Sequence, residues 1–247
     1  MAIATPGQRG MTRRQLLVRS ASTIVSAGLG SVATPYLSRA PDRPQIPCGI
    51  QSGDVSAASA VVWARADRPA RMMVECSTVE SFASIVHAAS IDALPERDFV
   101  AKVSIDGLPP GQDIFYRVRL ADFDAGLAGQ TQTGHLRTPP GRGRSVSFVW
   151  SGDTAGQGWG IDPARGGMRT YRTMLNNRPD FFIHCGDHIY ADCPIERELK
   201  LPDGGIWRNI VTEEKSAVAH SLEQFRGNYK YNWLDQNFRD FHAFVPM

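Results

Sequence analysis

Two Gly-Asp pairs, each directly after a short apolar run, are the residues of this chain best suited to chemistry. Asp153 follows the run at 146–150, and Asp187 follows the run at 181–185. Two carboxylates that face each other repel unless a cation lies between them, and hard di- or trivalent metals prefer oxygen ligands. Either pair alone is explained by an aspartate that caps a turn. The two pairs together favour a metal site.

Tyr190 adds a third oxygen donor to this candidate site. It lies three residues after Asp187, in the segment Gly-Asp-His-Ile-Tyr at 186–190. A tight turn after the strand directs it back toward the same metal. A phenol, with a pKa of about 10, loses its proton near neutral pH only beside a strong Lewis acid, and ferric iron is the most effective one. The ordinary alternative for Tyr190 is aromatic packing.

A strand, a helix and a second strand must position these side chains. The segment 168–177 lies between the two apolar runs and has helical spacing, with Met168, Tyr171 and Leu175 on one face. This order predicts a βαβ unit with a buried parallel pair of strands. Adjacent parallel strands end at one sheet edge, where open α/β folds bind ligands. The chain from Glu196 onward has a mostly helical composition, and its aromatic residues are expected to pack on the sheet.

Residues 46–140 have the pattern of an all-β domain. Short runs rich in β-branched and aromatic residues, with turn signals between them, predict a β-sandwich. These runs lie at 60–64, 71–77, 99–105 and 114–120. The segment 108–116 looks like a corner of a fibronectin type III-like sandwich. A stretch rich in Pro and Gly at 139–144 separates this domain from an α/β segment, residues 145–247.

The body of the chain is mildly acidic, although the whole sequence has a formal charge of +2. Residues 1–40 hold five arginines and no acidic residue, which leaves 22 basic and 25 acidic residues in the rest. This balance predicts no nucleic-acid-binding patch. The four cysteines match no zinc spacing and no disulfide framework. Cys185 is expected to be a buried thiol, and Cys193 is either a further ligand or an ordinary structural thiol.

The first forty residues have the order of a bacterial export signal. Arg13 and Arg14 precede an uncharged, weakly apolar stretch at 20–37, and small residues follow at plausible cleavage positions. The paired arginines are typical of the route that exports folded proteins, so residues 1–40 are predicted to be a twin-arginine signal peptide. The predicted location is the periplasm or the cell exterior. A disordered basic tail is the alternative, and the glycines and proline of 20–37 make it a poor membrane span.

The paired motifs resemble those of PhoD-type alkaline phosphatases, within the calcineurin-like metallophosphoesterases. Segments 151–158 and 186–192 are similar to the first two site motifs of that family, and the Gly-Asp-x-x-Tyr element also resembles that of purple acid phosphatases. Further similarity lies at 49–55, 60–63, 225–229 and 245–247. The resemblance therefore spans residues 46–247, and the twin-arginine leader agrees with it.

The resemblance implies hydrolysis of phosphate monoesters or diesters at two metal ions. It makes Asp153 a ligand of one metal, Asp187 the bridge between two, and Tyr190 a ligand of the iron-type site. His188 lies near the substrate or has a structural role. The best-known PhoD-type pattern has a cysteine ligand where Asp153 stands. Iron with calcium and a more ordinary divalent pair therefore both stay open.

The resemblance also implies an Asn motif and at least two further histidine motifs, which the sequence to Met247 does not contain. We therefore expect 145–247 to be the N-terminal part of a truncated metallophosphoesterase α/β domain, with little or no phosphatase activity in this chain alone. The alternatives are a non-catalytic exported binding protein and a purple acid phosphatase-like enzyme. The sequence argues against a nucleotide-binding domain, because its glycine-rich loop lacks the Gly-Lys-Ser/Thr element. It also argues against a serine hydrolase, because it has no nucleophile elbow.

Overall fold

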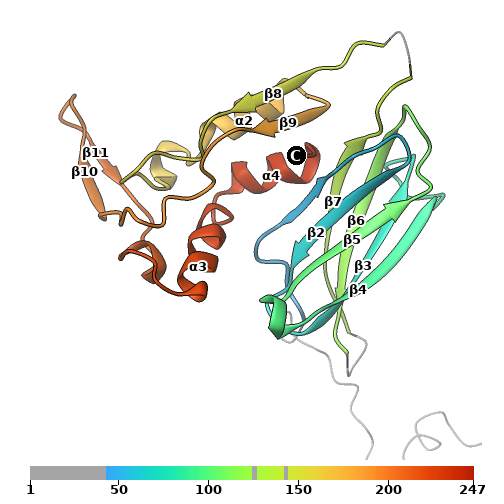
Figure 1. The fold of residues 1–247 in the computed structure, drawn as a ribbon, viewed down its shortest axis with the longest axis horizontal. Coiled ribbons are helices and arrows are strands. Elements are labelled where there is room, and N and C mark those ends of the chain that lie inside the picture. Colours follow the sequence, from blue (N-terminus) through green and yellow to red (C-terminus); the bar gives the residue numbers. More distant parts are fainter. Residues whose placement is uncertain (1–42, 124–126, 142–143) are drawn as a thin grey trace, which may run out of the picture. The chain divides into compact units, whose positions relative to one another are not determined.

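The computed structural model describes residues 43–123, 127–141 and 144–247 (Figure 1). The predicted signal peptide, residues 1–40, lies outside the described residues, as do 142 and 143 of the predicted boundary segment. Among the helices that the structure does describe, none combines the length and apolar character needed to cross a bilayer.

Two antiparallel sheets make up the first part of the described chain (Figure 1). One has the strand order β1-β2-β5 and the other β4-β3-β6-β7. The strands are β1 (Ile50–Gly53), β2 (Ser59–Arg65), β3 (Ala70–Ser77), β4 (His87–Ala93), β5 (Val100–Asp106), β6 (Asp113–Ala121) and β7 (Ala128–Arg137). A short 3-10 helix, η2 (Pro95–Arg97), precedes β5. These sheets fit the β-sandwich that the sequence predicted.

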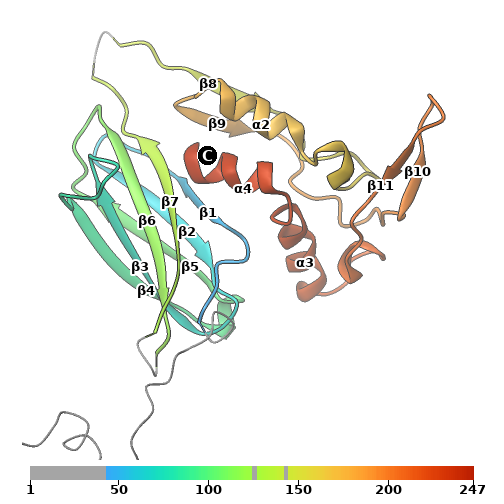
Figure 2. The ribbon, with the colours of Figure 1, turned by 180° about the vertical axis from the view of Figure 1, so that it is seen from behind.

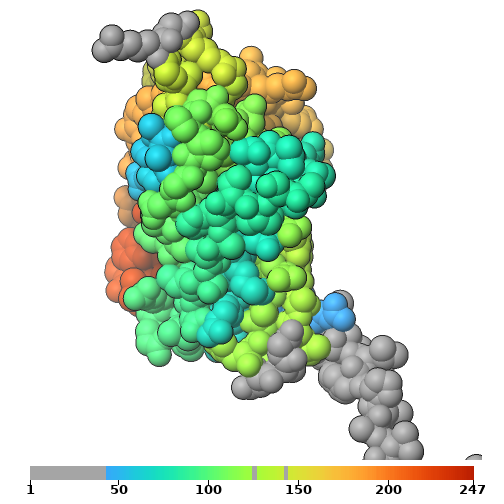
Figure 3. All heavy atoms as spheres, turned by 90° about the vertical axis from the view of Figure 1, so that its right-hand side faces the viewer, coloured from blue at the N-terminus to red at the C-terminus, as the bar shows by residue number. Residues whose placement is uncertain are grey.

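Alternating burial along the strands builds the core of the sandwich. In β2 every second side chain is buried, with Val62 fully enclosed, and β6 buries Ile114, Tyr116 and Val118 in the same way. The two-residue period of a strand places these side chains on one face, where both sheets contribute to a single cluster. On β6 the alternate side chains include the more exposed Arg117 and Arg119, and the space-filling view shows the surface of the sandwich in turquoise and green (Figure 3).

A parallel strand pair follows the sandwich. β8 (Phe148–Ser151) pairs with β9 (Phe181–His184), and α2 (Arg169–Asn176) lies between them in the chain. The predicted strand, helix, strand order and the parallel pairing are therefore confirmed. α2 and α4 (Gln236–Phe244) both lie beside the strand pair (Figure 2). They pack on the same face of the pair, where Tyr171, Phe182 and Phe241 form an aromatic cluster.

The prediction of a buried parallel pair is wrong for its second face. Phe148, Trp150 and Ile183 are 51%, 68% and 42% exposed, because alternate side chains of the two strands point away from α2 and α4. The prediction for Cys185 is also wrong. This thiol is exposed, because it follows the last residue of β9 at the end of the sheet.

The prediction of a mostly helical segment from Glu196 onward is correct only for its second half. β10 (Glu198–Lys200) and β11 (Ile206–Arg208) first form an antiparallel hairpin. Two short 3-10 helices, η3 (Pro163–Arg165) and η4 (Glu213–Lys215), precede and follow this hairpin in the chain. α3 (Leu222–Asn232) then begins with a capping box at Ser221, and α4 follows it. Phe225 and Tyr229 on α3 are exposed, so the expected packing of aromatic residues holds only in part.

The helices at the end of the chain contact the sandwich directly. The buried hydroxyl of Tyr116 on β6 donates a hydrogen bond of 2.9 Å to the carbonyl of Ala243 on α4. Trp63 of β2 stacks on Trp233, which follows α3, with ring centroids 5.0 Å apart. Because α4 also covers β8 and β9, these contacts support the strand pair whose ends carry the candidate ligands.

Candidate metal centre

The three predicted ligands lie together at the carboxyl ends of β8 and β9. Asp153 follows β8 and Asp187 follows β9, and Oδ1 of Asp153 accepts a hydrogen bond of 2.8 Å from the N–H of Asp187. The hydroxyl of Tyr190 hydrogen-bonds to Asp153. Both carboxylates are exposed, and Tyr190 is half-buried. Two carboxylates and a phenol, all oxygen donors, therefore share one edge of the sheet.

Gly186 permits this close approach of the two strand ends. A Cβ atom at this position would overlap Oδ1 of Asp153 and the carbonyl oxygen of Gly152. The backbone pairing also continues past the strands, because the N–H of Thr154 donates to the carbonyl of Asp187 at 2.9 Å. The glycine is therefore required by space, and any larger residue here would push the two aspartates apart.

The electrostatics of Tyr190 indicate that the site suits a cation. Partial burial, the hydrogen bond to Asp153 and the negative charges of Asp153 and Asp187 raise the pKa of its phenol. Without a cation the phenol therefore stays protonated. A metal ion among these oxygens has the opposite effect, since it stabilises the phenolate and balances the carboxylates. The donor set thus fits a hard metal ion, which prefers oxygen ligands.

No three His, Cys, Asp or Glu side chains of the described ranges converge as metal ligands. A centre built from this part of the chain therefore needs the phenol of Tyr190 as its third donor. Cys193, the further candidate, is a half-buried free thiol.

Buried polar side chains hydrogen-bond to the backbone carbonyls of the segment that carries Tyr190. Lys215 in η4 is buried, and its Nζ donates to the carbonyl of Tyr190 and to Oδ1 of Asn228, both at 3.0 Å. Asn232 of α3 donates its side-chain N–H to the carbonyl of His188 at 2.7 Å. Burial lowers the pKa of the Lys215 ammonium. Because carbonyls on both sides of Ile189 are fixed, the direction in which Tyr190 leaves the backbone is fixed too.

The sequence did not reveal these three supporting residues, Lys215, Asn228 and Asn232. Asn228 lies in the segment 225–229, which resembles the family, and that similarity is the only signal that the sequence offers. Lys215 has no such signal, since a lysine in a polar stretch ordinarily lies in solvent.

We expect Lys215→Met to weaken metal binding by about 10–100-fold, the usual cost of losing a group that orients a metal ligand. The reason is that the carbonyl of Tyr190 loses its fixed partner while the buried volume is kept. Competition with a chelator measures the affinity. Lys200→Met, on exposed β10, is the matched control. Unchanged metal affinity in a folded Lys215→Met variant would show that the segment needs no such support.

A chain of hydrogen bonds lies beneath the site. Oγ1 of Thr154 is 2.6 Å from the hydroxyl of Tyr171 and 2.9 Å from Nε2 of His184. The ring of His184 stacks on that of His188, with centroids 3.7 Å apart. Burial lowers the pKa of both histidines, so both rings are neutral at pH 7. His188 therefore packs against His184, and this contact does not depend on a substrate.

A cavity of about 780 Å³ opens beside Asp153. The glycine-rich loop after β8, the start of α2 and the β10–β11 hairpin line it, with Trp159, Arg169 and Trp207 among the side chains. A much smaller cavity next to Tyr190 shares Trp159 with it. Asp153 therefore lies at the edge of a space large enough for a small organic molecule, and Tyr190 lines only the smaller cavity.

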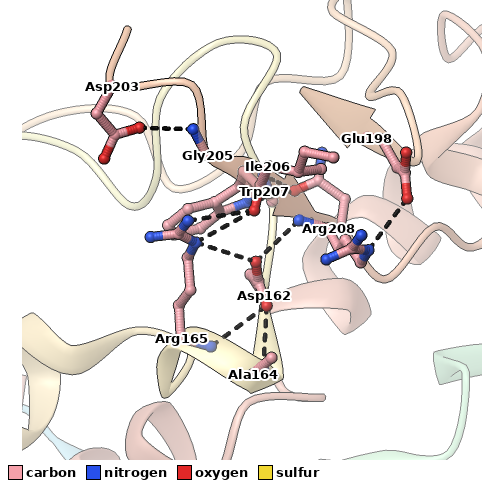
Figure 4. Close-up of polar contacts among 11 residues, drawn as sticks. Asp162, Ala164, Arg165, Glu198, Asp203, Gly205, Ile206, Trp207 and Arg208 are labelled. Carbon is pink, nitrogen blue, oxygen red and sulfur yellow. Dashed lines mark hydrogen bonds and ion pairs between the residues drawn. The ribbon is translucent and has the colours of Figure 1, made fainter. Parts of the chain in front are cut away.

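Asp162 fixes the wall of this cavity (Figure 4). Its buried Oδ1 accepts from the N–H groups of Ala164 and Arg165 at 3.0 and 3.3 Å, and Oδ2 accepts from the N–H of Arg208 at 2.8 Å. The guanidinium of Arg165 lies 3.6 Å from the same carboxylate and donates to the carbonyl of Ile206. One buried carboxylate thus joins the glycine-rich loop to the hairpin.

Comparison with known proteins identifies the class to which this fold and site belong. The family described as "PhoD-like phosphatase, N-terminal domain" matches residues 31–140, and the family described as "PhoD-like phosphatase" matches residues 148–247. The chain therefore belongs to the PhoD-like phosphatases, and the resemblance seen in its paired motifs is confirmed.

Two relatives define the extent of this similarity. Alkaline phosphatase D of Bacillus subtilis (strain 168) is 25% identical over 251 residues, which cover 94% of this chain and 40% of the relative. A solved structure described as "Structure of PhoD" is 21% identical, with a TM-score of 0.60. The match covers 81% of this chain and 38% of the chain in that structure. The chain thus spans about two fifths of the length of these relatives, and the second comparison supports the fold.

Proposed function

We propose that this chain supplies the first ligands of a two-metal phosphoesterase that hydrolyses phosphate monoesters or diesters. The observation that carries the proposal is the convergence of Asp153, Asp187 and Tyr190 at the ends of β8 and β9. Membership of the PhoD-like phosphatases supports the reaction class. The name of the Bacillus subtilis relative, alkaline phosphatase D, supports the same class.

The three residues have different roles in this proposal. Asp153 would hold one metal, Asp187 would be shared by two, and Tyr190 would hold the iron-type ion. When bound, the two ions supply an activated water and balance charge on the attacking and leaving oxygens. The protein keeps the carboxylates in place through the hydrogen bond from the N–H of Asp187 to Asp153. Oxygen donors favour hard ions, so iron with calcium and another hard divalent pair are both compatible with the site.

The finer features of the fold and its location form part of the same proposal. We assign the sandwich, residues 46–140, to the fibronectin type III-like class and residues 145–247 to part of a metallophosphoesterase α/β domain. The alternating burial of β2 and β6 and the parallel β8–β9 pair support these assignments. Residues 1–40 act as a twin-arginine signal peptide, so the protein works in the periplasm or outside the cell.

The metal dependence of phosphate binding and hydrolysis tests the proposed function. We expect the chain to bind inorganic phosphate, followed by ³¹P NMR, only when metal is present. We expect little or no turnover of p-nitrophenyl phosphate by this span alone. Any hydrolysis above the buffer rate should disappear with EDTA and in Asp187→Asn. Phosphate binding that needs no metal, or hydrolysis that survives both treatments, would contradict the proposal.

A further inference from the structure

We propose that the cavity beside Asp153 binds an aromatic leaving group, so that the preferred substrates are phosphate esters that carry an aromatic ring. This inference rests on the proposed phosphoesterase function and names its substrate class. It comes from the residues that line the cavity together with Asp153, among them two tryptophans, an arginine and three glycines.

The two tryptophans form an aromatic corner of the cavity. Trp159 comes from the glycine-rich loop and Trp207 from β11, and their rings meet nearly at right angles, at 83°, with centroids 5.6 Å apart. Trp159 remains 39% exposed although it lies beside a cavity. An indole in this position offers a flat apolar surface on which another ring can stack.

Trp207 is held in place before any ligand binds. Its Nε1–H donates to Oδ1 of Asn209 at 2.8 Å, and the same oxygen accepts from the N–H of Gly160 at 2.8 Å. The guanidinium of Arg165, which Asp162 anchors, lies 6.0 Å from the centroid of the Trp207 ring (Figure 4). A wall fixed in this way loses little conformational freedom when a ligand binds, and this favours affinity.

The rest of the lining suits a flat anion. Gly156, Gly160 and Gly167 line the cavity with backbone atoms. Arg169, at the start of α2, lines it as well, and its guanidinium has no ion-pair partner within the described ranges. A free guanidinium is a natural partner for a phosphate oxygen. An ester with its phosphate near Asp153 would therefore have its leaving group among the tryptophans.

Two phosphonates that differ only in their ring test this proposal. Phenylphosphonate and methylphosphonate are titrated into the metal-loaded chain by isothermal calorimetry. We expect phenylphosphonate to bind at least about ten-fold more tightly, as one stacked ring provides. Trp159→Leu and Trp207→Leu should each bring this ratio close to one, chiefly by weakening the binding of phenylphosphonate. Trp159→Phe keeps an aromatic face and should keep most of the preference.

Trp150→Leu is the matched control, because Trp150 is 68% exposed on β8 and does not line this cavity. It should leave the ratio unchanged, and loss of the preference in this variant would overturn the assignment. Equal affinity for both phosphonates in a chain that retains metal would refute the aromatic site and leave the phosphoesterase proposal intact. Loss of metal retention and of both ligands in the unmodified chain would refute the phosphoesterase proposal, and the aromatic site with it.

Discussion

Asp187→Ala is expected to abolish the retention of metal by this chain. Asp153→Ala should lower the metal affinity at least about 100-fold, because loss of a ligand costs no less than loss of a group that only orients one. Both side chains are exposed, so neither change removes core packing, and the expected effect on folding is small. Elemental analysis after gel filtration measures the bound metal. Asp192→Ala, an exposed aspartate in the same loop, is the matched control and should retain it.

The visible absorption of a metal-bound Tyr190 tests the same site in a second way. A ferric ion bound to a phenolate gives a visible charge-transfer absorption band, so the chain loaded with ferric iron should be coloured if Tyr190 is a ligand. Tyr190→Phe should lose the colour and keep part of the metal, because both carboxylates remain. Unchanged metal content in Asp153→Ala and Asp187→Ala would refute the site. A colour that persists in Tyr190→Phe would assign the band to another tyrosine.

The candidate ligands could be located from the sequence because local patterns determine their surroundings. Two short apolar runs and the helical spacing between them were enough to predict β8, α2 and β9 in parallel order. The first Gly-Asp pair directly follows β8 and the second comes one residue after the end of β9, so Asp153 and Asp187 had to lie at the same edge. The distance between them, by contrast, depends on Gly186, whose role became clear only in three dimensions.

Three strands of the sandwich, β1, β4 and β7, lie outside the predicted runs, and β4 and β7 were missed because their sequences have little apolar alternation. β7 is largely polar and exposed, and it belongs to the sheet because it pairs with β6 along its length. β4 consists mostly of small residues and pairs with β3 at the sheet edge. Whether such a segment forms a strand depends on pairing with its neighbours more than on the intrinsic β-propensity of its residues. The same holds for Lys215 and Asn232, whose role depends on a loop distant in sequence.

His242 is expected to make the protein sensitive to acid. It lies on α4 and is 2% exposed, with its ring centroid 4.3 Å from that of Phe238. Within the part of the chain that the structure describes, its Nδ1 has no hydrogen-bond partner. Burial, and then the nearby His188 and His184, lower its pKa to about 3. The folded protein therefore keeps this ring neutral where an unfolded chain, with a histidine pKa of about 6.5, takes up a proton.

The sign of the effect follows from this difference in proton binding. Below a pH of about 6.5, His242 binds a proton in the unfolded state, whereas in the folded state it does so only below about pH 3. The contribution of His242 to stability is thus fully present above about pH 6.5 and is lost as the pH falls, by up to about 1.4 kcal/mol per unit. Burial lowers the pKa of His184 and His188 as well, so these rings act in the same direction.

Urea unfolding at pH 7.5 and pH 5.0, followed by tryptophan fluorescence, measures this effect. His242→Phe should lose about 2 kcal/mol less stability between the two pH values than the unmodified chain. His220→Gln, at an exposed position before α3, should behave like the unmodified chain. If His242→Phe shows the full loss, the buried ring is not the cause. Because α4 covers the strand pair that ends at Asp153 and Asp187, the unmodified chain should also release its metal at a higher pH than His242→Phe.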